Sequence, residues 1–124
     1  MSVTTSHPTP KRGEVWLVNF DPTIGAEIKK VRRAVVVSSD AVGRLPLKLV
    51  APLTEWKPYF ANNIWHVRIA PDSTNGLTKT SAVDALQLRG VDTQRFIQQL
   101  GQLSHNAMEE ITLAIAAVIE YQQP

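Results

Sequence analysis

The sequence predicts a small, mainly β protein, a strongly curved antiparallel sheet or barrel that carries one helix at its C-terminal end. Short runs of β-branched and aromatic residues alternate with segments rich in Gly and Pro, and an apolar stripe at helical spacing comes last in the chain. With 124 residues, 44% of them hydrophobic and 19% charged, the chain has the composition and length of one globular domain with a single core.

Five strands are expected on the alternation of side chains. They span residues 15–20, 33–39, 47–54, 64–69 and 81–88. The first has apolar residues on both faces, with Trp16, Val18 and Phe20 on one and Val15 and Leu17 on the other, and is therefore expected to be buried on both sides. Residues 96–100 fit either a sixth strand or a helical turn, and the pattern leaves both open.

Proline and serine mark two further features. Pro52 indicates an unpaired edge or a bulge in the third strand, because proline has no N–H to donate to a ladder. Ser104 is a suitable N-cap for the final helix, and Glu109 and Glu110 lie in its early turns, where carboxylates suit the helix dipole. The apolar stripe of this helix is expected to comprise Met108, Ile111, Ile115, Val118 and Ile119.

The termini and the cysteine count limit the classes of protein. Residues 1–10 are rich in Thr, Ser and Pro and are expected to form a mobile tail, which leaves residues 11–124 as the domain. No signal-like segment and no apolar run of about 20 residues is present, so a soluble, cytoplasmic protein without membrane contact is expected. Cysteine is absent and the three histidines are scattered, so no metal or cofactor is expected.

Charge is distributed unevenly along the chain. Residues 1–57 hold nine Lys/Arg against five Asp/Glu, whereas the remainder holds four against six. This asymmetry points to an anionic partner, although a solvated basic face would account for it equally well.

The second and third strands are predicted to form a hairpin about the turn at Gly43. Residues i and j then lie opposite one another when i + j is near 86, which pairs Arg32 with Thr54 at the open end of the hairpin. A guanidinium beside a hydroxyl can hold a phosphodiester. The alternative is that Arg32 is a surface charge and Thr54 an ordinary strand residue.

Two loops flank this pair, a basic one at residues 23–31 and an aromatic one at residues 55–63. Exposed aromatic rings stack on unpaired bases, and long loops in small domains are often functional. A single-stranded nucleic acid is therefore the expected partner. The candidate RNA-binding residues are Glu27, Lys29, Lys30, Arg33, Trp56, Tyr59, Phe60, His66 and Gln87.

Four blocks of sequence occur in a characteristic order: RGEVWLVNFDPTIGAE from Arg12, VRRAVVVS from Val31, APLT from Ala51 and SAVDALQLRGVD from Ser81. Together they resemble the MazF/PemK family of toxins. The resemblance implies a CcdB/PemK-like fold, a compact SH3-like barrel with a C-terminal helix, and a homodimer. It also implies a metal-independent endoribonuclease of a type II toxin–antitoxin system that cleaves single-stranded RNA, and a cognate antitoxin whose acidic tail fills the RNA groove.

The resemblance also assigns roles to individual residues. The family's catalytic arginine falls on Arg32 and its catalytic threonine or serine on Thr54, the pair that the hairpin register brings together. Arg33 departs from the family, which usually has proline there, and this leaves open whether Arg32 or Arg33 faces the phosphate. The expected reaction is attack of the ribose 2′-hydroxyl on the adjacent phosphorus to give a cyclic phosphate, and no residue is assigned as the general base.

Several residues keep two interpretations. His66 is either a catalytic or RNA-contacting group or a packed strand residue. Gln87 either reads a base edge or makes a structural hydrogen bond, and Glu27 is expected to order the basic loop. For the whole chain, the alternative function is a non-catalytic SH3-like barrel toxin that binds a protein such as gyrase, as CcdB-type toxins do.

Overall fold

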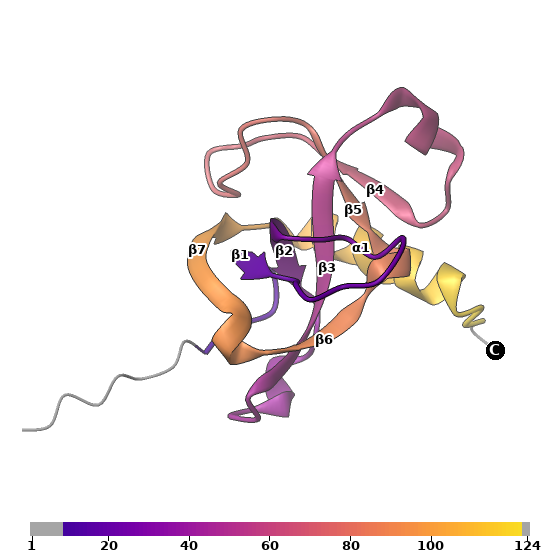
Figure 1. The fold of residues 1–124 in the computed structure, drawn as a ribbon. Helices are drawn as coiled ribbons and strands as arrows, with labels where there is room; N and C mark the ends of the chain where they lie inside the picture. The colour runs from indigo at the N-terminus through magenta and orange to yellow at the C-terminus, as the bar shows by residue number, and fades with distance from the viewer. Residues whose placement is uncertain (1–8, 123–124) are drawn as a thin grey trace, which may run out of the picture.

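Seven strands and one helix make up the computed structural model, which describes residues 9–122 (Figure 1). The elements are β1 (Glu14–Asn19), β2 (Val31–Val36), β3 (Leu47–Glu55), β4 (His66–Ile69), β5 (Ser81–Asp84), β6 (Arg89–Asp92), β7 (Phe96–Gln102) and α1 (His105–Val118). Short 3₁₀ turns occupy Asp40–Val42, Pro58–Asn62, Ala85–Gln87 and Thr93–Arg95. The predicted fold class, a curved antiparallel sheet with a C-terminal helix, is confirmed.

β3 is the central strand of the sheet, which runs in the order β4-β5-β3-β2-β1-β7 with β6 also paired to β3. On one side it changes partner: Leu47–Val50 pair with β6, and Leu53–Glu55 pair with β5. Pro52 lies in the interval between these two ladders, where its missing N–H costs no ladder bond. The predicted interruption at Pro52 is therefore confirmed.

The segment predicted as one strand over residues 81–88 is instead the strand β5 followed by a 3₁₀ turn, and β6 begins only at Arg89. β5 ends at Asp84, whose side chain accepts a hydrogen bond from the N–H of Leu86 at 3.0 Å and so caps the turn. This local side-chain bond competes with continuation of the ladder. The chain therefore bends at Ala85–Gln87 and enters β6 as a new strand.

The other predicted elements lie close to their observed positions. β2 begins at Val31 rather than at residue 33, and β4 begins at His66 rather than at residue 64. Residues 96–100, left open between strand and helical turn, belong to β7, which pairs with β1. Residues 1–8 of the predicted tail, which include His7, lie outside the described residues. Pro10, the last residue of the predicted tail, is buried.

The sheet is buried on both faces, each against its own apolar cluster. Val15, Val35, Ala51 and Leu53 belong to the cluster that packs against α1. The second cluster comprises Val18, Phe20, Ala34, Val36, Val50, Val91 and Phe96. Adjacent residues of β1 and β2 thus enter opposite clusters, as the period of two along a strand requires.

α1 begins as predicted. The hydroxyl of Ser104 accepts a hydrogen bond from the N–H of Ala107 at 3.1 Å, and Met108 and Ile111 are buried. The predicted stripe fails at its end, because Ile119 is 69% exposed and follows the helix as its C-cap. No helix in residues 9–122 combines the length and the apolar character that crossing a membrane requires.

β7 comes very close to the loop before β5. A Cβ at Gly101 would lie 2.4 Å from the carbonyl oxygen of Thr74 and 2.5 Å from the carbonyl carbon of Asn75. The N–H of Gln102 donates to the same Thr74 carbonyl at 2.9 Å, so the two backbones cannot separate without loss of this bond. Gly101 is therefore required by space.

We expect Gly101→Ala to lower the free energy of unfolding by about 3 kcal/mol, because a methyl group forced against backbone must displace one of the two segments. Gly25→Ala is the matched control. Gly25 has a φ of 58°, and a Cβ added there would meet nothing within 4 Å, so only the left-handed conformation is penalised, by about 1 kcal/mol. Urea unfolding of both variants checks this, and an equal loss would refute the steric explanation.

Candidate active site

The predicted hairpin register is confirmed. β2 and β3 pair Ala34 with Pro52, Val35 with Ala51 and Val36 with Val50, and the residue numbers in each pair sum to 86. The ladder ends at Ala34 and Pro52, and the same register extended by two residues would set Arg32 opposite Thr54. Side chains of opposed residues lie on the same face of a sheet, so the guanidinium and the hydroxyl share one face at the open end of the hairpin.

Arg32 and Thr54 also line one hollow, of about 370 Å³. Arg32 is exposed, and its Nε donates to the carbonyl of Lys29 at 3.2 Å, which leaves the two terminal nitrogens of the guanidinium free of this bond. Thr54 is half-buried and pairs with Ala82 of β5. The site is thus built where β2 and β5 flank β3.

Arg33 lies on the other face of β2. It is opposite Leu17 of β1, whereas Arg32 is opposite Val18, and adjacent residues of a strand point to opposite faces. Both arginines border the hollow, but only Arg32 shares a face with Thr54. The register therefore favours Arg32 over Arg33 as the partner of Thr54.

Four further polar or charged residues that line this hollow were not anticipated from the sequence: Glu55, Thr78, Lys79 and Ser81. Glu55 pairs with Ser81 across the β3–β5 ladder, and its carboxylate lies 3.5 Å from Nζ of Lys57 and 3.9 Å from Nζ of Lys79. β3 and β5 are separated by an irregular loop and β4, so no turn fixes their register. Of these four residues, only Glu55 could have been predicted from the sequence, because it directly follows Thr54.

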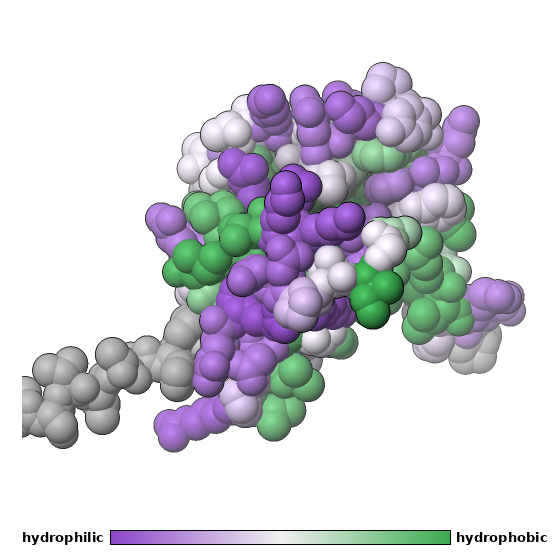
Figure 2. Space-filling view, in the orientation of Figure 1, coloured by the Kyte–Doolittle hydropathy of each residue, from purple (hydrophilic) through white to green (hydrophobic). Residues whose placement is uncertain are grey.

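The basic loop is ordered by its own side chains. Oε1 of Glu27 accepts from the N–H of Ile24 at 2.6 Å, in agreement with the expected loop-ordering role, and Oδ1 of Asp21 accepts from the N–H of Lys30 at 3.0 Å. Lys29 and Lys30 are exposed. In the view of Figures 1 and 2, the face that carries this loop is mostly hydrophilic.

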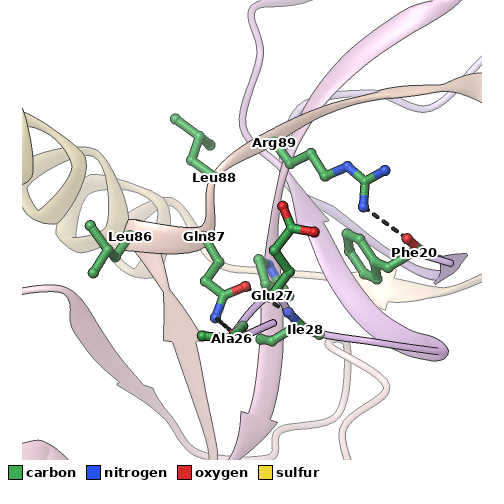
Figure 3. A pocket seen from close by; sticks show the side chains of 9 residues that line it. Phe20, Ala26, Glu27, Ile28, Leu86, Gln87, Leu88 and Arg89 are labelled. Carbon is green, nitrogen blue, oxygen red and sulfur yellow. Dashed lines mark hydrogen bonds between the residues drawn. The ribbon is translucent and has the colours of Figure 1, made fainter. Parts of the chain in front are cut away.

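Gln87 contacts the basic loop across a second hollow of about 360 Å³ (Figure 3). Its Oε1 accepts from the N–H of Ile28 at 2.7 Å, and its Nε2 donates to the carbonyl of Ala26 at 3.1 Å. Of the two interpretations of Gln87, the hydrogen bonds observed are the structural ones. A contact between Gln87 and a base remains a prediction.

The aromatic loop folds into the 3₁₀ turn Pro58–Asn62, and its rings pack on one another. Phe60 contacts Trp56 and Tyr59 edge to face, with ring centroids 5.8 and 4.9 Å apart. Tyr59 is 73% exposed, whereas Trp56 and Phe60 are half-buried. Tyr59 is therefore the ring of this loop that is most open to an incoming base.

Of the two interpretations of His66, the contacts observed are those of a packed residue. Its side chain is 8% exposed, because the Phe60 ring stacks on it with centroids 3.9 Å apart. Nε2 lies 3.8 Å from Oδ2 of Asp84, and Nδ1 lies 3.1 Å from Nδ2 of Asn63. Arg68, on the same strand, is exposed.

Burial shifts the pKa of both members of this pair. Desolvation lowers the pKa of His66 below 6.5, and the nearby carboxylate of Asp84 opposes that shift. Desolvation raises the pKa of Asp84, against the charge of His66 and the N–H groups of Leu86 and Gln87. Both groups therefore favour their neutral forms more than in water.

Among residues 9–122, no group of three or more His, Asp or Glu side chains is placed to hold a metal ion. What the site offers is a guanidinium, a hydroxyl and a basic surround. Such a set can hold a phosphodiester and stabilise added negative charge on it.

A family model for the PemK-like, MazF-like toxins of type II toxin–antitoxin systems matches residues 11–119. The chain belongs to this toxin family. It is 31% identical over 106 residues to the endoribonuclease MazF of Staphylococcus saprophyticus, covering 85% of this chain and 87% of that protein.

Solved structures agree with the fold. A crystal structure of MazF from Deinococcus radiodurans matches with a TM-score of 0.75 at 24% identity, over 90% of this chain and 96% of that one. A mycobacterial endoribonuclease in complex with its cognate antitoxin matches with a TM-score of 0.74 at 20% identity, over 94% and 100%. The SH3-like toxin fold is thereby confirmed.

The lowered pKa of His66 makes folding stability depend on pH. The unfolded chain takes up this proton near pH 6.5, before the folded protein does, so stability is full above pH 6.5 and is lost as the pH falls. The raised pKa of Asp84 acts in the opposite sense, adding stability as the pH falls through it.

We expect the urea midpoint of the wild type to fall between about pH 7.5 and pH 5.5, the window in which His66 of the unfolded chain becomes protonated. His66→Gln should flatten this dependence, whereas His105→Gln, at an exposed position of α1, should keep it. An equal pH slope in wild type and His66→Gln would contradict the assignment.

Proposed function

We propose that this toxin is a metal-independent endoribonuclease that cleaves single-stranded RNA. The observation that carries the proposal is the hollow that Arg32 and Thr54 both line, just beyond the end of the β2–β3 ladder. Membership of a family with endoribonuclease relatives supports the same function. A protein that acted only by binding a target would not require this pair.

In the proposed reaction the ribose 2′-oxygen bonds to the adjacent phosphorus, the bond from phosphorus to the 5′-oxygen breaks, and a 2′,3′-cyclic phosphate results. The terminal nitrogens of Arg32 stabilise the charge on the phosphorane. Thr54 orients the phosphate through its hydroxyl. A guanidinium has a pKa above about 12 and is a poor base, so the 2′-hydroxyl proton passes to another acceptor, such as water.

The loops supply the substrate contacts in this proposal. Lys29, Lys30 and Arg33 attract the RNA backbone, and Tyr59, supported by Trp56 and Phe60, stacks on a base. Stacking of this kind needs an unpaired base. The substrate is therefore single-stranded RNA.

The proposed partner that controls the activity is a cognate antitoxin. The mycobacterial relative has been solved with one, and the cations around the hollow, Arg32, Arg33 and Lys79, suit an acidic segment. The family resemblance adds a homodimer as the proposed assembly. The absence of cysteine suits the reducing cytoplasm, where the RNA targets lie.

We expect the wild type to cut a long single-stranded RNA in EDTA at discrete positions and to leave cyclic phosphate ends. Arg32→Ala should lower the rate at least about 100-fold, in line with removal of one transition-state donor. Thr54→Val keeps the shape of the side chain without its hydroxyl and should also lower the rate. Mapping the ends on a sequencing gel checks the cut positions and the rates of both variants. Resistance of the new termini to periodate checks that they carry a phosphate rather than a free diol.

Two matched arginine variants test the assignment. Arg33→Ala, on the opposite strand face, should raise KM more than it lowers kcat, and Arg44→Ala, exposed and outside the hollow, should have no effect. If the folded wild type leaves RNA intact, or Arg32→Ala cuts as fast as wild type, the proposed site is wrong. Tight capture of gyrase by an RNA-inactive wild type would support the protein-binding alternative.

Glu55 offers a separate electrostatic test. Its carboxylate neutralises Lys57 and Lys79 beside the hollow, so Glu55→Gln should increase the positive potential and lower KM by about threefold at low salt. Glu109→Gln, on the exposed face of α1, is the control. If Glu55→Gln instead abolishes kcat and flattens its pH profile, Glu55 is the general base.

A further inference from the structure

The basic loop before Arg32 has few apolar contacts of its own. Residues 24–27 and 29–30 are exposed, and Ile28 alone of this stretch packs against an apolar cluster. A segment with so little burial is held by hydrogen bonds or is not held at all. Besides the bonds that Glu27 and Asp21 make to its backbone, the position of the loop therefore depends on groups that bond to it from more distant parts of the chain.

One side chain binds the middle of this loop from a distant part of the chain. The primary amide of Gln87 pairs with the backbone on both sides of Glu27, accepting from Ile28 N at 2.7 Å and donating to Ala26 O at 3.1 Å (Figure 3). An amide has one acceptor and one donor end, and here each end meets its complement. Glu at this position would keep the first bond and lose the second.

Gln87 is itself held firmly. It ends the 3₁₀ turn that Asp84 caps, and within that turn Ala85 is buried and its N–H donates to the carbonyl of Trp65 at 2.8 Å. Two residues on, Arg89 donates to the carbonyl of Phe20 at 2.8 Å and lies over the Phe20 ring. The segment around Gln87 thus fixes both the start and the middle of the loop.

The anchored stretch leads directly to the catalytic guanidinium. Ile28 precedes Lys29, whose carbonyl accepts the hydrogen bond from Nε of Arg32 at 3.2 Å. The N–H of Phe20 in turn donates to the carbonyl of Lys30 at 2.9 Å. By binding the N–H of Ile28, Gln87 therefore also restrains the neighbouring carbonyl of Lys29, which accepts from Nε of Arg32.

We propose that Gln87 is a positioning residue for the cleavage reaction: its amide holds the backbone of Ala26 and Ile28, so that Lys29 aims the guanidinium of Arg32 at the phosphate. This inference rests on the proposed endoribonuclease function. It assigns to Gln87 a role exerted through Arg32 rather than through contact with RNA.

The test compares Gln87→Met, which keeps the length of the side chain without its polar atoms, with Gln87→Glu and wild type. Gln98→Met, at an exposed position of β7, is the control. We expect Gln87→Met to lower kcat about tenfold with KM within about a factor of two, since small misplacements of catalytic groups cost rate rather than binding. Gln87→Glu should fall between, and Gln98→Met should match wild type.

Two measurements without RNA separate this inference from the proposed function. Hydrogen exchange at Ile28 should accelerate in Gln87→Met, and the ¹⁵N signal of Arg32 Nε should shift toward that of a free guanidinium. If wild type does not cleave RNA, the proposed function fails, and these two readings alone decide whether Gln87 positions Arg32.

Two results would overturn the inference. A rise in KM at unchanged kcat in Gln87→Met would assign Gln87 to direct RNA contact. Faster exchange at Ile28 with an unchanged Arg32 signal and unchanged kcat would show that the loop anchor does not reach the guanidinium.

Discussion

The structure depends on β3 having two different partners along one side. Its first half pairs with β6 and its second half with β5, and the interval at Pro52 lets the sheet bend without an unsatisfied N–H. On its other side β3 pairs with β2. Thr54 therefore lies where three strands meet, which gives a short threonine side chain access to groups from β2, β5 and the loops between them.

The sequence predicted the β2–β3 part of the site because the two strands are close neighbours in the chain. A turn at Gly43 fixes the register, and a period of two then decides which arginine lies with Thr54. The β5 side could not be predicted in this way, since Thr78, Lys79 and Ser81 reach the hollow through a pairing between distant segments. Long-range register is set by the whole core, not by a turn.

The strand expected over residues 81–88 is too long because a short side chain bonds locally. Asp84 caps a 3₁₀ turn and ends the strand halfway, and the alternation of residues along a strand does not reveal such a cap. His66 pairs with Asp84 across the β4–β5 ladder and lies against the ring of Phe60. A histidine whose residue type suggested chemistry is thus part of the packing.

Gln87 bonds to main-chain atoms of Ala26 and Ile28 and to none of the loop's side chains. The side chains at residues 24 and 29 can therefore change through evolution while the anchor is kept, whereas the carboxylate of Glu27 also orders the loop. A toxin built in this way can diversify the surface it presents to RNA, or to an antitoxin, without redesigning the support beneath its guanidinium. The sequence of the loop can diverge while the reaction is kept, because substitutions change side-chain atoms whereas Gln87 binds main-chain atoms.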